Sequence, residues 1–189
     1  MPSDPITTTA IILAAGGSTR MGSPKALLDW CGEPLISAHI EALSARCYHI
    51  VVVLGSNADA IAAVLPPSVT VRVNSHWAST EPKDSLRIRL TNVRGPVLVT
   101  PVDVPPAPER VLDILLDTGA PAVPTHADKD GHPVLIDAEH TADTLQHKRL
   151  DQVLDGATRV SVEWAATLLN INTPEQWASY SSSLPGPRS

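Results

Sequence analysis

The chain has 189 residues, of which 43% are hydrophobic and 18% charged, and its formal net charge is -6. A chain of this length can bury one full hydrophobic core, so we expect a single domain. The acidic balance argues against a broad basic surface for nucleic acid or anionic lipid, and we therefore expect small substrates. No apolar run approaches the roughly 18 residues of a membrane span, and the N-terminus lacks signal-peptide features, so we expect a cytoplasmic protein with no membrane contact.

Strand-like apolar runs alternate with helix-like segments through residues 10–116. The valine-rich run His49 to Leu54 is typical of a parallel strand buried on both faces. In chain order, we predict a strand at 10–13, a helix at 34–45, a strand at 49–54, a helix at 57–65 capped by Ser56 or Asn57, a strand at 69–73, a helix at 84–90, a strand at 97–100 and a helix at 109–116 whose end Gly119 marks. This alternation predicts a parallel sheet with helices on both faces.

Beyond Gly119 the strands become shorter and the connections more polar. We predict strands at 122–123, 134–136, 160–162 and 168–171, and a helix at 174–180 capped by Thr173. The serine- and proline-rich residues 181–189 predict a disordered tail. One domain would therefore cover 1–180, with a nucleotide-binding half at about 8–118 and an acceptor-binding half at about 119–180.

The most informative stretch is Ile11 to Leu28, where an apolar run breaks into a glycine-bearing loop with one arginine and one lysine. Glycines let the main chain approach phosphate oxygens, backbone N–H groups donate to them, and Arg20 and Lys25 supply positive charge. Pro24 and Ala26 flank Lys25, which excludes the P-loop ending Gly-Lys-Ser/Thr, and the glycines do not form G-x-G-x-x-G. The stretch predicts a cradle for a nucleoside triphosphate.

A second signal is Asp103, which follows the predicted strand 97–100 within Thr-Pro-Val-Asp-Val-Pro-Pro. A carboxylate at a junction between strand and loop can bind Mg²⁺ and, through it, phosphates. Asp-x-Pro is also common in turns, but the cradle upstream favours the metal ligand. We predict Asp103 as a ligand of Mg²⁺.

The strings Leu13-Ala14-Ala15-Gly16, Arg20-Met21-Gly22 and Pro24-Lys25 resemble the signature loop of MobA/MocA-like nucleotidyltransferases, which include molybdenum-cofactor guanylyl- and cytidylyltransferases. The resemblance extends, more distantly, to sugar-1-phosphate nucleotidyltransferases. It implies an α/β fold: a single-domain, Rossmann-like three-layer sandwich of the nucleotide-diphospho-sugar transferase type, with a mostly parallel sheet and sites at the carboxyl ends of its strands. The nucleotide-binding residues that it implies are Leu13, Ala14, Ala15, Gly16, Gly17, Ser18, Arg20, Met21, Gly22, Lys25 and Ser85.

Three further segments resemble motifs of this family. The segment 74–87 resembles the one beside the nucleotide base, although its usual glycine is missing; it implies a base contact for Ser85 and leaves Arg87 open. The segment 169–175 resembles the family motif Asp-Ile-Asp-Thr-Pro-Glu-Asp, but asparagines stand at 170 and 172 in place of the first two aspartates. Asn172 therefore either ligates Mg²⁺ through its carbonyl or only caps the last helix. The turn 131–134 places His132 either at the acceptor phosphate or in a structural role.

The chemistry implied is attack by an acceptor phosphate on the α-phosphorus of a nucleoside triphosphate, with pyrophosphate leaving. Lys25, Arg20 and Asp103 would be the catalytic residues and Mg²⁺ the cofactor, and an ionised phosphate needs no general base. Ala-Ala-Gly in the loop favours CTP over GTP. The acceptor would be molybdopterin-like, a sugar phosphate or another phosphorylated metabolite, and the protein a monomer or weak homodimer.

Two alternatives belong to other classes. A glycosyltransferase of related fold would show an Asp-x-Asp metal motif, and Val102-Asp103-Val104 lacks its second aspartate. A non-catalytic nucleotide-binding module would fit the asparagines at 170 and 172, whereas the presence of Lys25 and Asp103 favours an enzyme.

Overall fold

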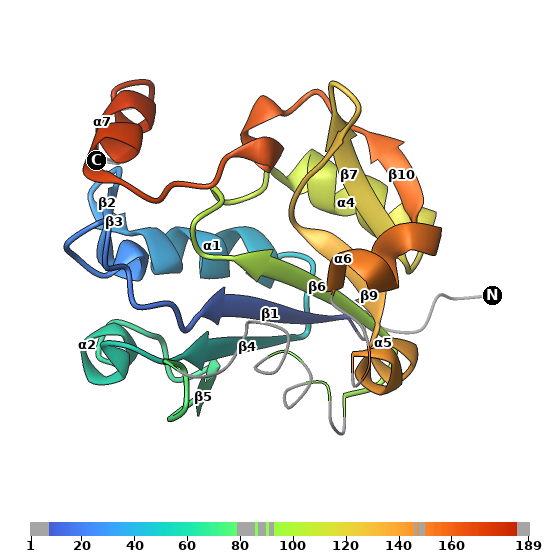
Figure 1. Ribbon diagram of the computed structural model, residues 1–189, viewed down its shortest axis with the longest axis horizontal. Coiled ribbons are helices and arrows are strands. Elements are labelled where there is room, and N and C mark those ends of the chain that lie inside the picture. The colour runs from blue at the N-terminus through green and yellow to red at the C-terminus, as the bar shows by residue number, and fades with distance from the viewer. Residues whose placement is uncertain are drawn as a thin grey trace.

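The computed structural model describes residues 8–78, 86, 90, 93–145, 147 and 150–184. Eight strands form one sheet in the order β10-β7-β9-β6-β1-β4-β5, with β8 paired to β7, and β2 and β3 form a separate hairpin (Figure 1). The strands are β1 Thr9–Ala14, β2 Asp29–Trp30, β3 Glu33–Pro34, β4 His49–Leu54, β5 Thr70–Val73, β6 Pro96–Pro101, β7 Ala122–His126, β8 Lys129–Asp130, β9 Val134–Asp137 and β10 Thr158–Ser161.

Helices and single turns of 3₁₀ helix connect these strands. The α-helices are α1 Leu35–Ser44, α2 Ala58–Ala62, α4 Glu109–Thr118, α5 Ala138–Thr144, α6 Leu150–Val153 and α7 Pro174–Ser181, and the 3₁₀ segments are η1 Lys25–Leu27, η2 Leu154–Gly156 and η3 Ala165–Leu168. None of the helices in the described part of the chain combines the length and apolar character needed to cross a membrane.

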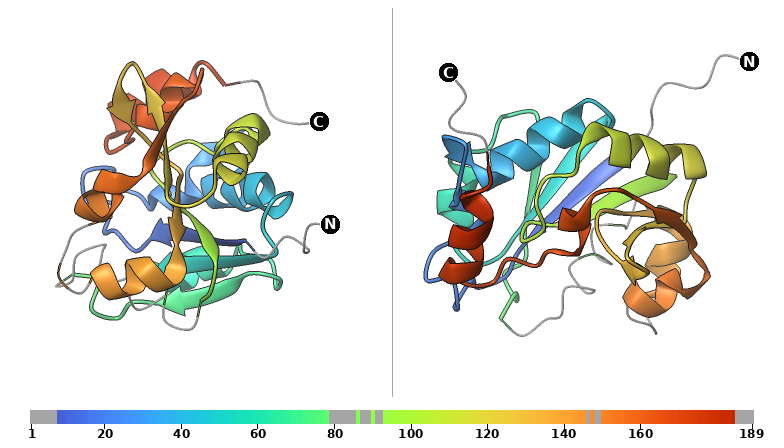
Figure 2. Two further views of the ribbon diagram at one scale, coloured as in Figure 1. Left: turned by 90° about the vertical axis from the view of Figure 1, so that its right-hand side faces the viewer. Right: turned by 90° about the horizontal axis from the view of Figure 1, so that it is seen from above.

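Each face of the sheet has its own hydrophobic core. Ala10 and Ile12 of β1 point to one face and pack in a cluster with residues of α1 and α4, whereas Ile11 points to the other face and packs with Leu86 and Leu90. This alternation follows from the period of two along a strand. Figure 2 shows α1 and α4 running together over the strands. The expected three-layer sandwich with helices on both faces is therefore confirmed.

The order of the strands determines where a site can form. β1 pairs in parallel with β4 on one side and with β6 on the other, and β9 is antiparallel to both β6 and β7. The chain moves outward from β1 to β4 and β5 and then returns to the opposite side of β1 at β6. The crevice at the carboxyl ends of β1 and β6 is therefore the topological switch point, where open α/β sheets bind ligands.

Most predicted elements are present, and several have the predicted bounds. The strand at His49–Leu54 agrees at both ends, α4 ends before Gly119 with φ +81, and Thr173 forms a capping box with Gln176 at the start of α7. The helix predicted at 84–90 lies mostly outside the described residues, although Leu86 and Leu90 are buried.

Three predictions about local structure are wrong. Residues 168–171 form no strand, because Leu168 ends η3 and the Ile171 N–H donates to the Asp103 carbonyl instead of to a neighbouring strand. The helix predicted at 57–65 ends at Ala62, and Asn57 lies in the left-handed region at φ 56 without a side-chain cap bond. The predicted tail includes Ser181, which belongs to α7.

Candidate active site

The glycine-bearing loop after β1 is organised around Ser18. Its carbonyl accepts hydrogen bonds from the N–H groups of Met21 and Gly22 at 3.0 and 3.1 Å, and its Oγ accepts from the Lys25 N–H at 3.2 Å. Gly22 has φ +75, which favours glycine, and the Met21 side chain is buried. These residues therefore close the turn that carries Lys25 toward the sheet.

The first half of the loop lines a cavity of about 390 Å³ at the switch point. The predicted nucleotide-binding residues that line it are Leu13, Ala14, Ala15, Gly16, Gly17, Ser18 and Lys25. The N–H groups of Met21 and Gly22 donate to the Ser18 carbonyl within the turn, and neither residue is among those that line the cavity. Ser85, predicted beside the base, lies outside the described residues.

Asp103 lies beside this loop because the backbones of the two loops are joined. The Val102 N–H donates to the Leu13 carbonyl at 3.0 Å, which ties the chain after β6 to the end of β1. Lys25 Nζ lies 2.9 Å from Asp103 Oδ2, with the two side chains 12% and 22% exposed. The sequence places these residues 78 positions apart, and the parallel pairing of β1 with β6 brings them together.

Asn172 completes the cluster from the far end of the chain. The Ile171 N–H donates to the Asp103 carbonyl at 2.8 Å and so holds this segment against the loop after β6. The Asn172 Oδ1 atom then accepts from Lys25 Nζ at 2.6 Å and from Arg20 Nη2 at 3.2 Å. Four of the predicted site residues, Arg20, Lys25, Asp103 and Asn172, thus form one cluster.

The orientation of the Asn172 amide follows from its neighbours. Its Nδ2 donates to the Asn170 backbone carbonyl at 3.0 Å and to Asn170 Oδ1 at 2.6 Å. Ammonium and guanidinium groups only donate, and a backbone carbonyl only accepts, so the oxygen of Asn172 must face Lys25 and Arg20. Asn170 therefore holds the oxygen of Asn172 toward the site.

The oxygen atoms that contact Lys25 could also bind a divalent metal. Asp103 Oδ2 and Asn172 Oδ1 both contact the Lys25 ammonium, so two oxygens are already arranged around one cation. A carboxylate and an amide carbonyl are hard oxygen ligands of the kind that Mg²⁺ and Mn²⁺ accept. The donor set fits such a metal, with the remaining ligands to come from phosphate and water.

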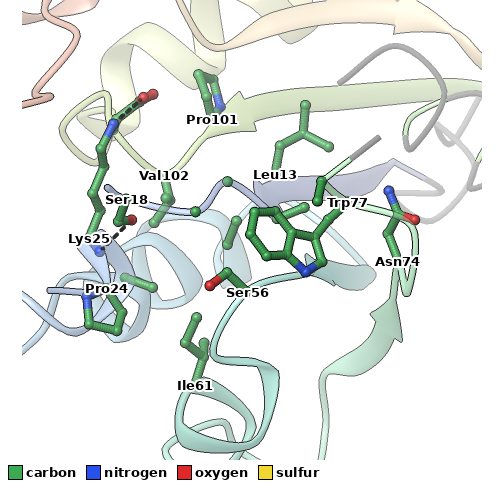
Figure 3. Close-up of a pocket in the computed structure, with 17 residues that line it drawn as sticks. Leu13, Ser18, Pro24, Lys25, Ser56, Ile61, Asn74, Trp77, Pro101 and Val102 are labelled. Atoms are coloured by element: carbon green, nitrogen blue, oxygen red, sulfur yellow. Dashed lines mark hydrogen bonds and ion pairs between the residues drawn. The ribbon is translucent and has the colours of Figure 1, made fainter. Parts of the chain in front are cut away.

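Trp77 also lines the cavity, and Figure 3 shows its ring between Ser18 on one side and Asn74 on the other. Its backbone N–H donates to the Asn74 carbonyl at 3.2 Å, and Asn74 is tied in turn to Leu54 of β4. A Cβ on Gly55 would lie 2.7 Å from Trp77 Cβ, and a Cβ on Gly17 would lie 2.9 Å from the indole. The two glycines therefore make room for the ring, which is a pocket residue that we did not predict individually.

His132 lies near Asp103, on the side of the expected acceptor. Its backbone N–H donates to the Thr167 carbonyl at 3.0 Å, and Thr167 Oγ1 donates back to the His132 carbonyl at 2.8 Å. Burial lowers the pKa of His132, while the negative charge of Asp103 opposes the shift. Its Nδ1 atom is buried without a hydrogen-bond partner in the described part of the chain.

His39 is a buried neighbour of the site that our sequence analysis missed. It is 1% exposed on α1, and burial lowers its pKa from 6.5 to about 4, while the nearby backbone of Val104 and Val102 and the charge of Asp103 act in the opposite direction. Its burial could have been predicted from the sequence, because His39 follows Leu35 by four residues and precedes Leu43 by four, which places all three on one face of the helix. It supports the loop that carries Asp103 from beneath.

A Rossmann-like sheet with a glycine loop, two cations and a carboxylate at its switch point defines a nucleotidyltransferase type of protein. The comparison with protein families agrees: the MobA-like NTP transferase domain matches residues 10–164, and the chain belongs to this family. The expected family and enzyme class are thereby confirmed.

Relatives and solved structures extend this likeness over most of the chain. Nicotine blue oxidoreductase of Paenarthrobacter nicotinovorans is 33% identical over 69% of this chain and 71% of its own length. The 2-C-methyl-D-erythritol 4-phosphate cytidylyltransferase of Saccharopolyspora erythraea is 28% identical over 89% of this chain and 74% of its own. A nucleotidyl transferase from Methanothermobacter, 22% identical, superposes with a TM-score of 0.80 over 93% of this chain and 96% of its own.

A divalent metal is present in one structure of this fold. The crystal structure of Rv0371c from Mycobacterium tuberculosis in complex with manganese is 22% identical, with a TM-score of 0.76, and covers 94% of this chain and 100% of its own.

Proposed function

We propose that this protein transfers a nucleoside monophosphate from a nucleoside triphosphate to a small phosphorylated acceptor and releases pyrophosphate. The observation that carries the proposal is the convergence of Lys25, Arg20, Asp103 and Asn172 beside the glycine-bearing loop. Both reactants are anions, so catalysis here requires neutralisation and alignment more than covalent participation.

Each residue has a separate task in this proposal. The backbone N–H groups of residues 15–18 bind the β- and γ-phosphates, because these residues line the cavity at its loop end. Arg20 adds positive charge beside Asn172. Lys25 reaches the α-phosphate and offsets the negative charge that grows there in the transition state. Asp103 and Asn172 hold the Mg²⁺ cofactor, which when bound neutralises phosphate charge. The ionised acceptor phosphate needs no base.

The base and the acceptor lie at opposite ends of the same crevice in this proposal. Trp77 and Asn74 form the wall available to the base, and the Ala-Ala-Gly loop together with the cytidylyltransferase relative favours CTP over GTP. His132, in the half formed by residues 119–180, contacts the acceptor phosphate. Candidate acceptors are molybdopterin-like phosphates, sugar phosphates and other phosphorylated metabolites, handled by a cytoplasmic monomer or weak homodimer.

The direct test is pyrophosphate release, measured with each of the four ribonucleoside triphosphates and a panel of phosphorylated acceptors. Lys25→Ala and Asp103→Ala should each abolish turnover while leaving the folded state intact by circular dichroism. Lys129→Ala and Asp117→Ala remove the same charges from exposed positions and should retain wild-type rates. Turnover by Lys25→Ala at the wild-type rate would refute the role given to Lys25.

A second candidate is an oxidoreductase, favoured by the 33% identity to a protein with that name. The same loop would then bind the phosphates of a reduced nicotinamide dinucleotide, which would transfer a hydride to an oxidised small-molecule substrate without breaking a phosphate bond. The two candidates differ in product: the first yields pyrophosphate, and the second consumes reduced dinucleotide with a change in its near-ultraviolet absorbance. Measuring both signals on one preparation separates them.

A further inference from the structure

We propose that Lys25 competes with the divalent metal for Asp103 and Asn172, so that the protein binds metal tightly only when the phosphates of a nucleotide engage Lys25. The inference rests on the function proposed above and specifies how its ligands bind. The site prefers the metal–nucleotide complex to the metal ion alone.

The geometry of Lys25 carries the proposal. Its Nζ lies 2.9 Å from Asp103 Oδ2 and 2.6 Å from Asn172 Oδ1, which are the two oxygens that we assign to the metal. The Lys25 ammonium and a divalent cation at these oxygens would repel one another, and they would compete for the same two oxygens. A metal ion that enters alone must therefore displace Lys25 from two short, charge-assisted hydrogen bonds.

The asparagine at 172 strengthens this competition. Asp103 is the one carboxylate in the described cluster, whereas Lys25 and Arg20 both donate to the neutral Asn172 oxygen. A metal ion that enters alone would meet one negative charge and two positive ones. A polyphosphate changes this balance, because its oxygens offer Lys25 and Arg20 other acceptors and also supply ligands to the metal.

The binding of metal and the binding of nucleotide are thermodynamically linked in this proposal. If the nucleotide raises the affinity of the site for metal, the metal must raise its affinity for nucleotide by the same factor. Removing the positive charge of Lys25 should weaken this coupling by improving the binding of metal alone. That effect has the opposite sign to the loss of turnover expected from the same substitution.

The experiment is a titration of the full-length protein with Mn²⁺ alone, followed by electron paramagnetic resonance of the unbound ion. Lys25→Met should bind Mn²⁺ at least about tenfold more tightly than wild type, because it removes both the competitor and its charge. Lys129→Met, at an exposed position, should match wild type. Adding Asp103→Asn to Lys25→Met should abolish the gain, which places the bound ion at this site.

Lys25→Gln gives a second measurement, because glutamine keeps a hydrogen-bond donor without the charge. If neither Lys25 variant gains affinity while thermal unfolding shows both to be folded, the competition is overturned, even where wild-type transfer activity supports the proposed function. If both gain affinity and no ribonucleoside triphosphate binds to wild type with Mn²⁺ by calorimetry, Lys25 competes with the metal, but the proposed function and the dependence of metal binding on nucleotide both fail.

Discussion

Acidification should destabilise the fold through His39, and the size of the effect follows from its burial. The side chain is 1% exposed, and burial lowers its pKa from 6.5 to about 4. As the pH falls through this window, the unfolded chain takes up a proton that the folded chain resists. Stability conferred by the neutral form is therefore present above about pH 6.5 and is lost as the pH falls toward about 4.

The shift corresponds to about 3 kcal/mol in total, at 1.36 kcal/mol for each pKa unit. Integrated between pH 7 and pH 5, the contribution of His39 to the free energy of unfolding should fall by about 2 kcal/mol. Burial of His132 shifts its pKa in the same direction, so the whole protein should lose more than this.

Urea unfolding of wild type and His39→Leu at several pH values between 7 and 5 would measure the effect. The variant will also differ from wild type at pH 7, because leucine differs in shape and polarity from the buried imidazole, so the comparison concerns the change of stability with pH. We expect the slope of His39→Leu to be shallower by about 2 kcal/mol over this range, and the exposed His49→Gln to keep the wild-type slope. Equal slopes for wild type and His39→Leu would refute the argument from burial.

Two further predictions concern the glycines of the site and the cap of α7. Gly55→Ala should destabilise the fold by at least about 1 kcal/mol, because its Cβ would lie 2.7 Å from Trp77 Cβ, whereas Gly16→Ala meets nothing within 4 Å and should reduce nucleotide affinity without changing the melting temperature. Equal melting temperatures for the two variants would contradict this. Thr173→Ala should cost about 1 kcal/mol by removing the capping box of α7, and Thr118→Ala, on an exposed helix end, should cost less in the same thermal melts.

The first half of the fold, through Gly119, could be predicted because its signals are local. The run His49–Leu54 is apolar without interruption, and Gly119 ends α4 in a conformation that favours glycine. The region after η3 could not be predicted in this way. Its apolar residues suit a strand, yet the Ile171 N–H bonds to the Asp103 carbonyl, a partner 68 positions earlier, and no periodicity within 168–171 contains that information.

The same distinction separates the site residues that were predicted from those that were missed. Lys25 and Asp103 each follow a buried strand in recognisable strings, and their meeting follows from the rule that parallel strands end at one edge of a sheet. The position of Trp77 in the cavity wall could not be predicted from the sequence, because it depends on the absence of a side chain at Gly55 and Gly17 in two other loops.

Asn172 shows what geometry adds to a recognised motif. Replacement of aspartate by asparagine can be read in the sequence as a loss of charge, which leaves both a weakened metal ligand and a simple helix cap as interpretations. The structure shows that its amide is held by Asn170 on one side and directs its oxygen to Lys25 and Arg20 on the other. A cap alone would not need that orientation, since Thr173 and Gln176 already form the capping box of α7. The asparagine is therefore better explained as part of the cationic cluster than as the start of a helix.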